Sequence, residues 1–537
     1  MPRRTFAGSR AWKRRRTAAV WAVGALLVAG STALSAAPAS ASGKPTTSAA
    51  SKIVYQVHPI ALRSVLSTPA ASQIPPYSPG MSPGQCVILY GLACYTPQIL
   101  HSAYQVPWKI NGQLAGTGES VAIIDAYGSP TVASDLATFD KSFGLPAANL
   151  HVWYPTGKPA YNPRQHLSET GWAEETSLDV QTVHDLAPGA TINLVVASSP
   201  NGNVLNNAER FAVQNHLGTV MTMSFGIPEA AFRGNNAQLI QANSIYQQAA
   251  AQGMSVFASS GDSGATNGYP APNANFPSSD PYVTSTGGTD LFVASDASLQ
   301  TTNVVKLESN DSVDQIIKLA NNYTSASGAY SNETAWADFN SSTCPFGCAF
   351  GPFGAAGGAA SAVFPAPSWQ TALPSWTTAT SSQAAGGSAM RTTSDVAFNT
   401  SVYTGTMIYL GFLGGGNNGF YFFGGTSEAS PSWAAIIADL DQARAAAGKG
   451  PLGLMGPRLY PLASATSSYA ANFNNVTVGE NNEPAKAPGF FAGPGYNLPT
   501  GLGTPIVTGL LGTFAPGATS SLTGPVGPSV PTVQPLK

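Results

Sequence analysis

The sequence predicts an α/β fold in which helices cover both faces of a parallel sheet. Four runs of apolar and β-branched residues have the pattern of buried strands, and they fall at 119–127, 190–198, 219–225 and 254–261. Segments of helical character lie between these runs, and this alternation favours right-handed crossovers between parallel strands. Of the 537 residues, 43% are hydrophobic, which is enough for a large core, while 56 Gly and 42 Pro indicate a loop-rich chain.

The first 41 residues predict a secretory signal. Basic residues come first, an apolar run follows, and the small residues Ala39-Ser40-Ala41 form a cleavage site. We therefore expect cleavage after Ala41 and a secreted protein, with an uncleaved membrane anchor as the alternative. No later stretch is long and apolar enough to cross a bilayer, so no stable membrane anchor is expected.

Residues 42–93 predict a short N-terminal extension that is rich in Ser and Pro and has little periodicity. The four cysteines form two close pairs, Cys86 with Cys94 and Cys344 with Cys348. An even number of cysteines in an exported chain favours two local disulfide loops. Zinc binding by four thiolates is the alternative, but these spacings match no common zinc motif.

The rest of the chain divides into helical, Gly-rich and tail segments. Helices are predicted at 171–189, 204–216, 235–253 and 428–448. Residues 265–420 are rich in Gly, Ser, Thr and Asn and contain only short strand candidates. Residues 514–537, rich in Pro and Ser, predict a disordered tail.

Charged residues are scarce, at 9% against roughly 25% in an average soluble protein. The net charge is −2 and no basic patch occurs outside the N-terminus, so nucleic acid is not an expected partner. Acid denaturation comes mostly from protonating paired carboxylates, so a chain with only 26 Asp and Glu should tolerate acid. The alternative is the ordinary composition of a secreted protein rich in Ala, Ser and Thr.

The helix predicted at 171–189 carries two carboxylates on the side that its apolar residues assign to the core. Successive helical residues turn by about 100°, which places Glu175 and Asp179 within the arc that contains Trp172 and Leu178. Two carboxylates one turn apart on a buried face cannot both ionise cheaply, so one pKa should be raised strongly. If the helix is rotated, the pair faces a polar groove, which is itself a candidate functional site.

Two further motifs place reactive side chains at the ends of predicted elements. In FGGTSEASPSWAAII, Ser427 lies in the first turn of a helix, where unpaired N–H groups and the helix dipole favour negative charge. In ASSGDSG, Asp262 follows a predicted strand, and sites in open parallel sheets form beyond the carboxyl ends of strands. Each motif alone has a simpler interpretation, because Ser427 could cap the helix and Asp262 could close an Asx-turn.

Three motifs together resemble a known family. The segment Gly425–Pro431 resembles the serine motif of subtilisin-like proteases, but none of the six histidines has the His-Gly-Thr-His context that a subtilisin requires. In order along the chain, Glu175–Asp179, Ser260–Gly264 and Gly425–Pro431 instead resemble the sedolisins, the serine-carboxyl peptidases. Further matches are YTPQILHSAYQV, VAIIDAY, MSFGIPE and AGPGYNLPTGLG, so the resemblance covers about residues 94–513. It implies a subtilisin-like fold with a single large catalytic domain, and peptides or proteins as substrates.

The resemblance implies a role for the serine and for each acid. Ser427 would be the nucleophile, Glu175 its general base, and Asp179 the residue that orients Glu175. Asp262 would donate a hydrogen bond to the oxyanion, which a carboxyl group does only when protonated, so activity is expected in acid. Asp125, at the end of the first predicted strand, is interpreted as a structural or subsite residue.

The implied activity is that of an endopeptidase or a tripeptidyl-peptidase, carried by a monomer. One alternative is a conventional subtilisin whose histidine is not recognisable in the sequence. An alternative from a different class is an inactive homologue that serves as an exported binding or surface protein.

The C-terminal region departs from the family pattern. Sedolisins bind calcium there through two aspartates and backbone carbonyls, and the corresponding positions are Asn475, Val476, Gly493, Gly495 and Asn497. Because calcium affinity rises with ligand charge, two amides in place of carboxylates should weaken such a site greatly. We expect the amides to hydrogen-bond the loop directly, with no cofactor, and weak calcium binding is the alternative.

Two other features differ from the family. Residues 42–93 are too few for the folded propeptide domain that sedolisins usually have, so they are a short remnant or a separate chain assists folding. Glu428 follows Ser427, where a small or apolar residue is commoner. We expect Glu428 and Glu174 to face solvent, with contact to the substrate as the alternative for Glu428.

Overall fold

The computed structural model describes residues 53–57, 59–62, 74–160, 166–232, 236–296, 312–340, 345, 353–382, 389–483 and 488–536. The predicted signal at 1–41 and the predicted pair Cys344 and Cys348 lie outside these residues. In the described part, residues from 52 onward belong to one compact unit.

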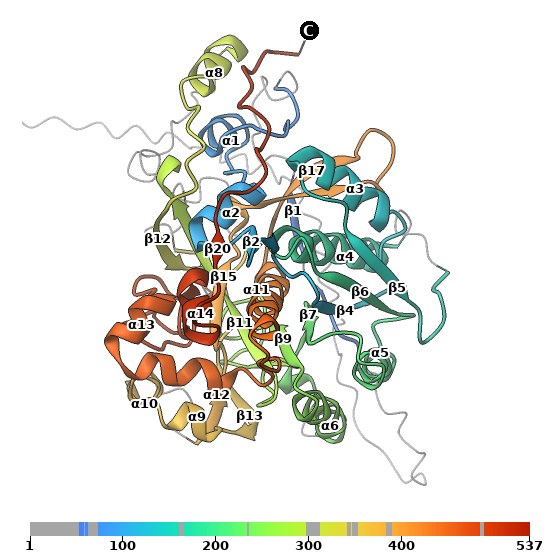
Figure 1. The fold of residues 1–537 in the computed structure, drawn as a ribbon, viewed down its shortest axis with the longest axis vertical. Coiled ribbons are helices and arrows are strands. Elements are labelled where there is room, and N and C mark those ends of the chain that lie inside the picture. The colour runs from blue at the N-terminus through green and yellow to red at the C-terminus, as the bar shows by residue number, and fades with distance from the viewer. Residues whose placement is uncertain are drawn as a thin grey trace, which may run out of the picture. The chain divides into compact units, whose positions relative to one another are not determined.

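A parallel sheet forms the centre of this unit (Figure 1). Its strand order is β12-β11-β9-β7-β4-β6-β5, and β15 also pairs with β11. Within the described residues every neighbouring pair is parallel except β11 with β12. The strands are β4 Ser120–Ala126, β5 Asn149–Trp153, β6 Thr191–Ala197, β7 Val220–Met223, β9 Ser255–Ser259, β11 Thr284–Val293, β12 Tyr330–Ala335 and β15 Val396–Asn399. The predicted parallel sheet is therefore confirmed, and its four predicted strands are β4, β6, β7 and β9.

Helices cover both faces of this sheet, as predicted. The large helices are α3 Val132–Phe143, α4 Leu167–Leu186, α5 Gly202–Gln214, α6 Ala237–Ala251 and α11 Thr426–Ala446. Along β4, Val121 and Ile123 pack in one hydrophobic cluster with residues of α4 and α11. The alternate residues Ala122 and Ile124 pack in a second cluster with residues of α5 and α6. Successive side chains of a strand point to opposite faces, so the two clusters lie on opposite sides of the sheet.

Shorter elements surround the sheet and its helices. The other strands are β1 Ile60–Leu62, β2 Lys109–Ile110, β3 Gln113–Leu114, β8 Ile227–Pro228, β10 Asn275–Phe276, β13 Ala360–Pro365, β14 Met390–Thr392, β16 Thr406–Leu410, β17 Gly419–Gly424, β18 Phe473–Asn474, β19 Thr504–Pro505 and β20 Ser520–Ser521. The other α-helices are α1 Pro83–Tyr90, α2 Pro97–Tyr104, α8 Val313–Ala320, α9 Ser368–Thr371, α10 Pro374–Ser382, α12 Gly456–Leu459, α13 Thr466–Asn472 and α14 Val507–Phe514. Short 3-10 helices span Glu229–Phe232, Ala294–Asp296, Val402–Thr404 and Tyr460–Ser464.

Helix α11 is buried on all sides over its first four turns. The prediction that Glu428 faces solvent is therefore wrong. Glu428 has no exposed surface, because the sheet formed by β1, β17 and β16 covers that side of the helix. Its Oε1 accepts a hydrogen bond from the hydroxyl of Thr406 on β16. Burial raises the pKa of Glu428 to about 8. Glu174 on α4 is also partly buried rather than exposed, and burial raises its pKa to about 7.

One predicted disulfide lies in the described residues and is confirmed. Cys86 in α1 is bonded to Cys94, with the two Cα atoms 5.8 Å apart. The disulfide closes a short loop between α1 and α2, and both sulfur-bearing residues are fully buried. Among the described residues, no helix has the length and apolar character needed to cross a membrane.

The prediction of a disordered tail is wrong for the described residues 515–536. Ser520 and Ser521 form β20 and pair with β2. Further on, the carbonyl oxygen of Pro531 accepts a hydrogen bond from Gln85 of α1. Val533 is buried, and its backbone exchanges two hydrogen bonds with the Asn321 side chain after α8. The tail therefore runs from α14 to α1 and α8 (Figure 1), because its backbone groups and Val533 find partners there.

Candidate active site

The carboxyl ends of three parallel strands position one side of the site. Strands β4, β7 and β9 are neighbours, so their carboxyl ends meet at the same edge of the sheet. Asp125 is the penultimate residue of β4, and Ser224 directly follows β7. Asp262 follows β9 after a short turn. The sheet thus brings together three polar side chains from distant parts of the sequence.

The start of α11 supplies the other side of the site. Gly425 precedes the helix with φ 107°, a conformation that favours glycine. A Cβ atom there would also lie 2.9 Å from Asp262 Oδ2, so glycine is needed for both backbone and space. Ser427 is the second residue of α11, and backbone N–H groups of the first turn have no acceptor inside the helix. Its hydroxyl therefore lies beside an N–H group that is free to bind an oxyanion.

Thr426 joins Asp262 to the start of α11. Asp262 Oδ1 accepts hydrogen bonds of 2.7 Å from both the backbone N–H and the hydroxyl of Thr426. The Thr426 hydroxyl in turn accepts a hydrogen bond of 3.1 Å from the N–H of Gly261. Asp262 is held at the end of the helix next to Ser427 by these contacts.

Ser224 joins Ser427 to the acid pair on α4. Its hydroxyl lies 2.8 Å from Asp179 Oδ1 and 3.1 Å from the carbonyl oxygen of Ser427. The Ser427 hydroxyl lies 3.4 Å from the carbonyl oxygen of Ser224. Ser224 lies in the segment MSFGIPE, which supports the family resemblance but assigns no role to this serine, so Ser224 was not predicted as a site residue. Its position directly after a predicted strand was the available signal.

The acid pair is buried beneath Ser427. Glu175 and Asp179 have no exposed surface, and burial raises the pKa of each carboxyl well above its ordinary value. The neighbouring charge of Asp179 raises the pKa of Glu175 further, whereas the nearby Ser427 hydroxyl lowers it. The carboxylate oxygens of Glu175 accept no hydrogen bond of ordinary geometry from the described residues. Glu175 thus faces the Ser427 hydroxyl with oxygens available to take a proton.

Asp125 is a third acid in the same buried group. It has no exposed surface, and burial raises its pKa to about 7, against the lowering effect of the Thr176 hydroxyl. Its negative charge raises the pKa of both Glu175 and Asp179. Asp125 therefore lies close enough to the acid pair for its charge to act on both carboxyls. Because each ionised carboxyl raises the pKa of its neighbours, the three do not lose their protons independently.

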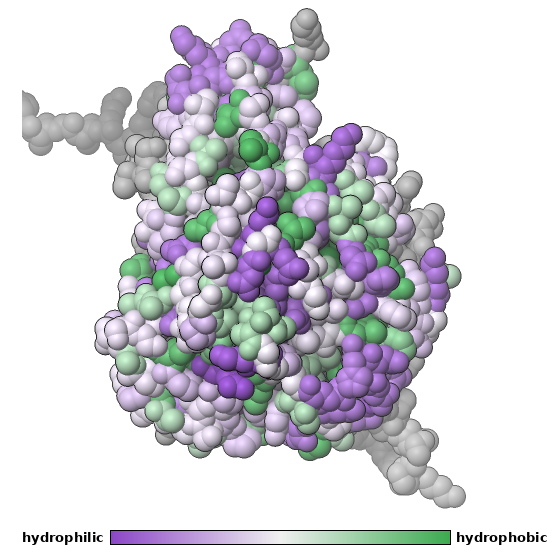
Figure 2. Space-filling model, in the orientation of Figure 1, coloured by the Kyte–Doolittle hydropathy of each residue, from purple (hydrophilic) through white to green (hydrophobic). Residues whose placement is uncertain are grey.

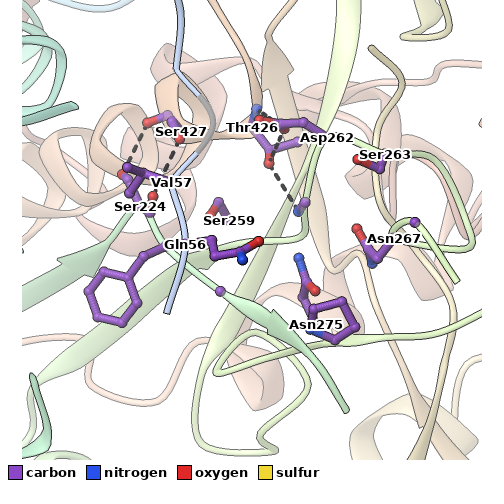
Figure 3. A pocket seen from close by; sticks show the side chains of 15 residues that line it. Gln56, Val57, Ser224, Ser259, Asp262, Ser263, Asn267, Asn275, Thr426 and Ser427 are labelled. Atoms are coloured by element: carbon purple, nitrogen blue, oxygen red, sulfur yellow. Dashed lines mark hydrogen bonds between the residues drawn. The ribbon is translucent and has the colours of Figure 1, made fainter. Parts of the chain in front are cut away.

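A cavity of about 190 Å³ opens in front of these residues. Figure 3 shows Ser427, Thr426 and Asp262 along its upper edge, with Ser224 below Ser427. Asn267 and Asn275 line the opposite side, and Gln56 and Val57 from the N-terminal segment cross the cavity. The structure therefore places Asp262 and Ser427 at one opening and buries Glu175 and Asp179 behind Ser427, although the four residues come from two helices and one loop.

Comparisons with known proteins agree with this arrangement, although no protein-family model matches the chain. Kumamolisin from Bacillus sp. strain MN-32 is 30% identical over 434 residues, covering 80% of this chain and 65% of kumamolisin. Tripeptidyl-peptidase 1 from Rattus norvegicus is 27% identical over 445 residues, covering 78% of this chain and 64% of that protein. The solved structure of Pseudomonas sedolisin, a serine-carboxyl proteinase complexed with two molecules of pseudo-iodotyrostatin, is 25% identical with a TM-score of 0.58, covering 79% of this chain and 98% of that one. These similarities support assignment to the sedolisin family.

The likeness to Pseudomonas sedolisin confirms the subtilisin-like fold that the motifs implied. The chain spans less than two thirds of the length of kumamolisin and of rat tripeptidyl-peptidase 1. Two of the three motifs, after β9 and at the start of α11, line the cavity, and the third lies buried on α4.

The family resemblance implies a calcium site in the C-terminal loop, and the contacts of Asn497 show whether the residues there could hold the ion. The Oδ1 atom of Asn497 accepts hydrogen bonds from the backbone N–H of Thr500 at 3.0 Å and from the Thr500 hydroxyl at 2.8 Å. A backbone N–H can only donate, so this contact fixes which end of the amide is oxygen. The Nδ2 atom of Asn497 then donates to the carbonyl oxygens of Val476 at 3.1 Å and Gly493 at 3.3 Å.

These contacts do not fit a calcium cage. A cation would need the Val476 and Gly493 carbonyls as ligands, and the amide nitrogen of Asn497 already faces both of them. The second amide is also engaged, because Asn475 Oδ1 accepts from the Gly495 N–H at 3.2 Å and the Tyr469 hydroxyl at 3.1 Å. No group of three or more His, Cys, Asp or Glu that suits a metal ion occurs among the described residues.

Proposed function

We propose that this chain is a secreted serine-carboxyl peptidase that hydrolyses peptide bonds of peptides or proteins in acid solution. The observation that carries the proposal is the position of Ser427, which faces Glu175 on one side and has Asp262 on the other. The similarity to kumamolisin and to sedolisin, described as a serine-carboxyl proteinase, supports it. The signal-like residues 1–41 support export, and we expect the active form to be a monomer.

In the proposed mechanism Ser427 attacks the peptide carbonyl carbon while Glu175 takes the hydroxyl proton. Asp179 holds Glu175 in place and, with the hydroxyl of Ser224, shares the resulting charge. The negative oxygen of the tetrahedral intermediate lies between the N–H of Ser427 and a protonated Asp262. Glu175 then returns its proton to the leaving amine, and an acyl-enzyme remains on Ser427. Water hydrolyses the acyl-enzyme by the same steps, which restores the serine hydroxyl.

The two acid roles set the expected pH dependence. Glu175 acts as a base only when the buried acid group has lost a proton, so activity should fall at the lowest pH. Asp262 donates a hydrogen bond only when protonated, so activity should also fall as that carboxyl ionises. The rate should therefore follow a bell-shaped curve with its maximum in acid.

The proposal is tested by hydrolysis of a mixed peptide library across about pH 3 to 7, the range in which carboxyls and histidine titrate. Ser427→Ala and Glu175→Gln should each lower kcat by at least about 1000-fold. The matched control is Glu174→Gln, a partly buried neighbour on the same helix, which should keep kcat within a few-fold. Full activity of Glu175→Gln would contradict the carboxyl mechanism. Product lengths distinguish an endopeptidase from a tripeptidyl-peptidase.

We also propose that the loop around Asn497 is stabilised without calcium. The amides of Asn475 and Asn497 hydrogen-bond the loop directly, where carboxylates bound to an ion would otherwise hold it. Their contacts with Val476, Gly493 and Gly495 support this proposal. Folding and activity should then be unchanged by chelators.

A further inference from the structure

The N-terminal segment, described at residues 53–57 and 59–62, runs through the candidate active site. Val54 forms an antiparallel bridge with Asn201, and Gln56 forms one with Gly226, just after β7. Beyond the cavity the segment continues as β1, which pairs antiparallel with β17 up to Ile60 and Gly424. Gly424 lies three residues before Ser427. The segment therefore crosses the cavity between Gly226 and Gly424, past the proposed nucleophile.

The contact with Gly226 has the form of a bound peptide strand. The N–H of Gln56 donates to the carbonyl oxygen of Gly226 at 3.2 Å, and the N–H of Gly226 donates to the carbonyl oxygen of Gln56 at 3.2 Å. Such a reciprocal pair gives affinity through the main chain, whatever the side chain is. The Gln56 side chain is exposed, which agrees with a main-chain contact. Any extended peptide that lies along Gly226 could make the same two hydrogen bonds.

The preceding residue carries the specific contact. The Tyr55 side chain is only 4% exposed, and its ring meets Phe225 edge to face with the ring centres 5.2 Å apart. Gly202 leaves room for the ring, since a Cβ atom there would lie 3.2 Å from the Tyr55 ring. The hydrophobic cluster around the ring includes residues from α4, α5 and α6: Trp172, Leu205 and Tyr246. This aromatic-lined site, the Tyr55 site, lies beside the catalytic cavity.

A buried carboxyl lies near the polar end of the Tyr55 site. Glu209 on α5 has no exposed surface, and its charge acts on the Tyr55 hydroxyl closely enough to raise the pKa of that phenol. Glu209 Oε2 accepts a hydrogen bond of 3.2 Å from the Tyr246 hydroxyl. Its Oε1 has no hydrogen-bond partner among the described residues. The Tyr55 hydroxyl donates no hydrogen bond to it, so the site accommodates the ring and gives no basis for a preference for the hydroxyl.

We propose that the Tyr55 site is a specificity site of the substrate groove, which binds an aromatic side chain of an extended peptide aligned along Gly226. The N-terminal segment occupies this groove in the present structure and competes with substrate for it. Because the ring in this site is almost fully buried and packs edge to face on Phe225, an aromatic side chain binds more tightly than alanine. The inference rests on the proposed peptidase function, since it takes the cavity beside Ser427 as the place of the substrate.

Binding to catalytically silenced chains tests the inference without any cleavage. A fluorescent peptide with the sequence of residues 53–62, IVYQVHPIAL, is titrated into the full chain carrying Ser427→Ala, alone or with Tyr55→Ala. The double variant should bind the peptide at least about tenfold more tightly, because its own segment is anchored less firmly. The matched control replaces Val54, which is 41% exposed on the same segment, with Ala and should change affinity less than about threefold. Equal affinities for the three chains would overturn the inference.

Peptide variants test the aromatic preference on a single protein. With the Ser427→Ala, Tyr55→Ala chain, replacing the peptide tyrosine by alanine should weaken binding by about 100-fold, whereas replacing it by phenylalanine should change binding less than about threefold. Equal binding of the tyrosine and alanine peptides would overturn the proposed preference. If Tyr55→Ala does not fold, Gln56→Pro serves in its place, since it removes the N–H that contacts Gly226. If the Ser427→Ala chains bind the peptide but the parent hydrolyses no peptide, the proposed peptidase function is contradicted and the inference about the Tyr55 site is not.

Discussion

The site around Ser427 and the loop around Asn497 use opposite means to hold their structure. Around Ser427 the protein keeps three buried acids, although burial raises the pKa of each one. Around Asn497 two amides stand where the family resemblance implies carboxylates, and their described contacts are hydrogen bonds to the loop and to Tyr469 of α13. The comparison teaches that acids, in spite of the cost of burying them, gather where the proposed mechanism moves a proton. Neutral amides hold the loop, which has only to keep its shape.

The largest effect in this comparison is expected from substitutions of Asp262, which test whether an acid beside Ser427 takes part in the reaction. Asp262→Ala should lower kcat by about 100- to 1000-fold, because it removes a proposed oxyanion donor. Asp262→Asn keeps a donor at every pH and an oxygen acceptor for Thr426, so it should lose much less activity. Its activity should also persist to higher pH than that of the parent. The measurement is the pH profile of kcat, and an Asn profile that falls at the same pH as the parent profile would break the comparison.

The next largest effect is the loss of folding stability with rising pH, which the buried acids throughout the interior are expected to cause. Burial raises the pKa of Glu333 and Asp338 to about 7 and that of Glu209 and Glu428 to about 8. Each value lies above that of the unfolded chain, so the folded chain binds more protons between the two values. The stability that these groups contribute is therefore complete below about pH 4 and is lost as the pH rises through about 7 to 8.

Calorimetry should therefore show Tm falling by roughly 5 °C or more between pH 4 and pH 8. Hydrogen exchange of the Thr500 amide, which bonds to Asn497, provides the contrast. After correction for intrinsic exchange, its protection against local opening should be nearly independent of pH, because that loop is held by groups that do not titrate. A Tm that rises over this interval would show that the interior acids are charged in the folded state at pH 4.

A smaller effect comes from returning a charge to the loop. Asn497→Asp turns the two donated hydrogen bonds to Val476 and Gly493 into contacts between oxygens, which should destabilise the chain by about 2 kcal/mol. Asn475→Asp is the matched control, since Asn475 Oδ1 only accepts hydrogen bonds in the present structure. Thermal unfolding is measured in chelator and in millimolar calcium. The parent should be unaffected by calcium, whereas Asn497→Asp should recover stability, and a parent stabilised by calcium would contradict the proposal.

The smallest expected effect comes from a substitution of Glu428, which tests whether this acid near Ser427 takes part in the reaction or is only buried. Glu428→Gln keeps the shape of a buried side chain that is neutral in acid, so stability at pH 4 should change little. At pH 8 the glutamine has no proton to lose, and the fall in stability between the two pH values should shrink by on the order of 1–2 kcal/mol. Unfolding by denaturant at each pH measures both quantities. A loss of activity in acid comparable to that of Asp262→Ala would give Glu428 a chemical role.

Local patterns were sufficient to predict much of the fold. The runs that form β4, β6, β7 and β9 are continuous apolar stretches, as strands covered on both faces must be. The residues gathered around the cavity were also accessible, because they sit at strand ends and at a helix start, where turn and capping residues leave a recognisable pattern. Their roles were inferred from the family resemblance, since periodicity alone allowed simpler interpretations of Ser427 and Asp262.

The errors share one physical origin, which is contact between segments distant in sequence. Glu428 was assigned to solvent because an isolated helix has an outer face, but α11 is enclosed by the sheet on one side and β17 on another. The tail was assigned to disorder because it lacks periodicity, yet Val533 is buried beside α8. Tyr55 lay in a segment without regular pattern, and only the structure brings it to Phe225. Tertiary contacts of this kind leave no local signal in a sequence.

The contact between the C-terminal tail and α1 has a consequence for biogenesis. Gln85 bonds to Pro531 across 446 positions of the chain, and Asn321 holds Val533. The docking of α1 therefore cannot be completed until residue 533 has been synthesised and, if the chain is exported, has crossed the membrane. Such long-range closure is slow. Until that moment Gln85 and Asn321 lack their partners in the tail, so a chain that stops short of Pro531 would leave both side chains without these hydrogen bonds.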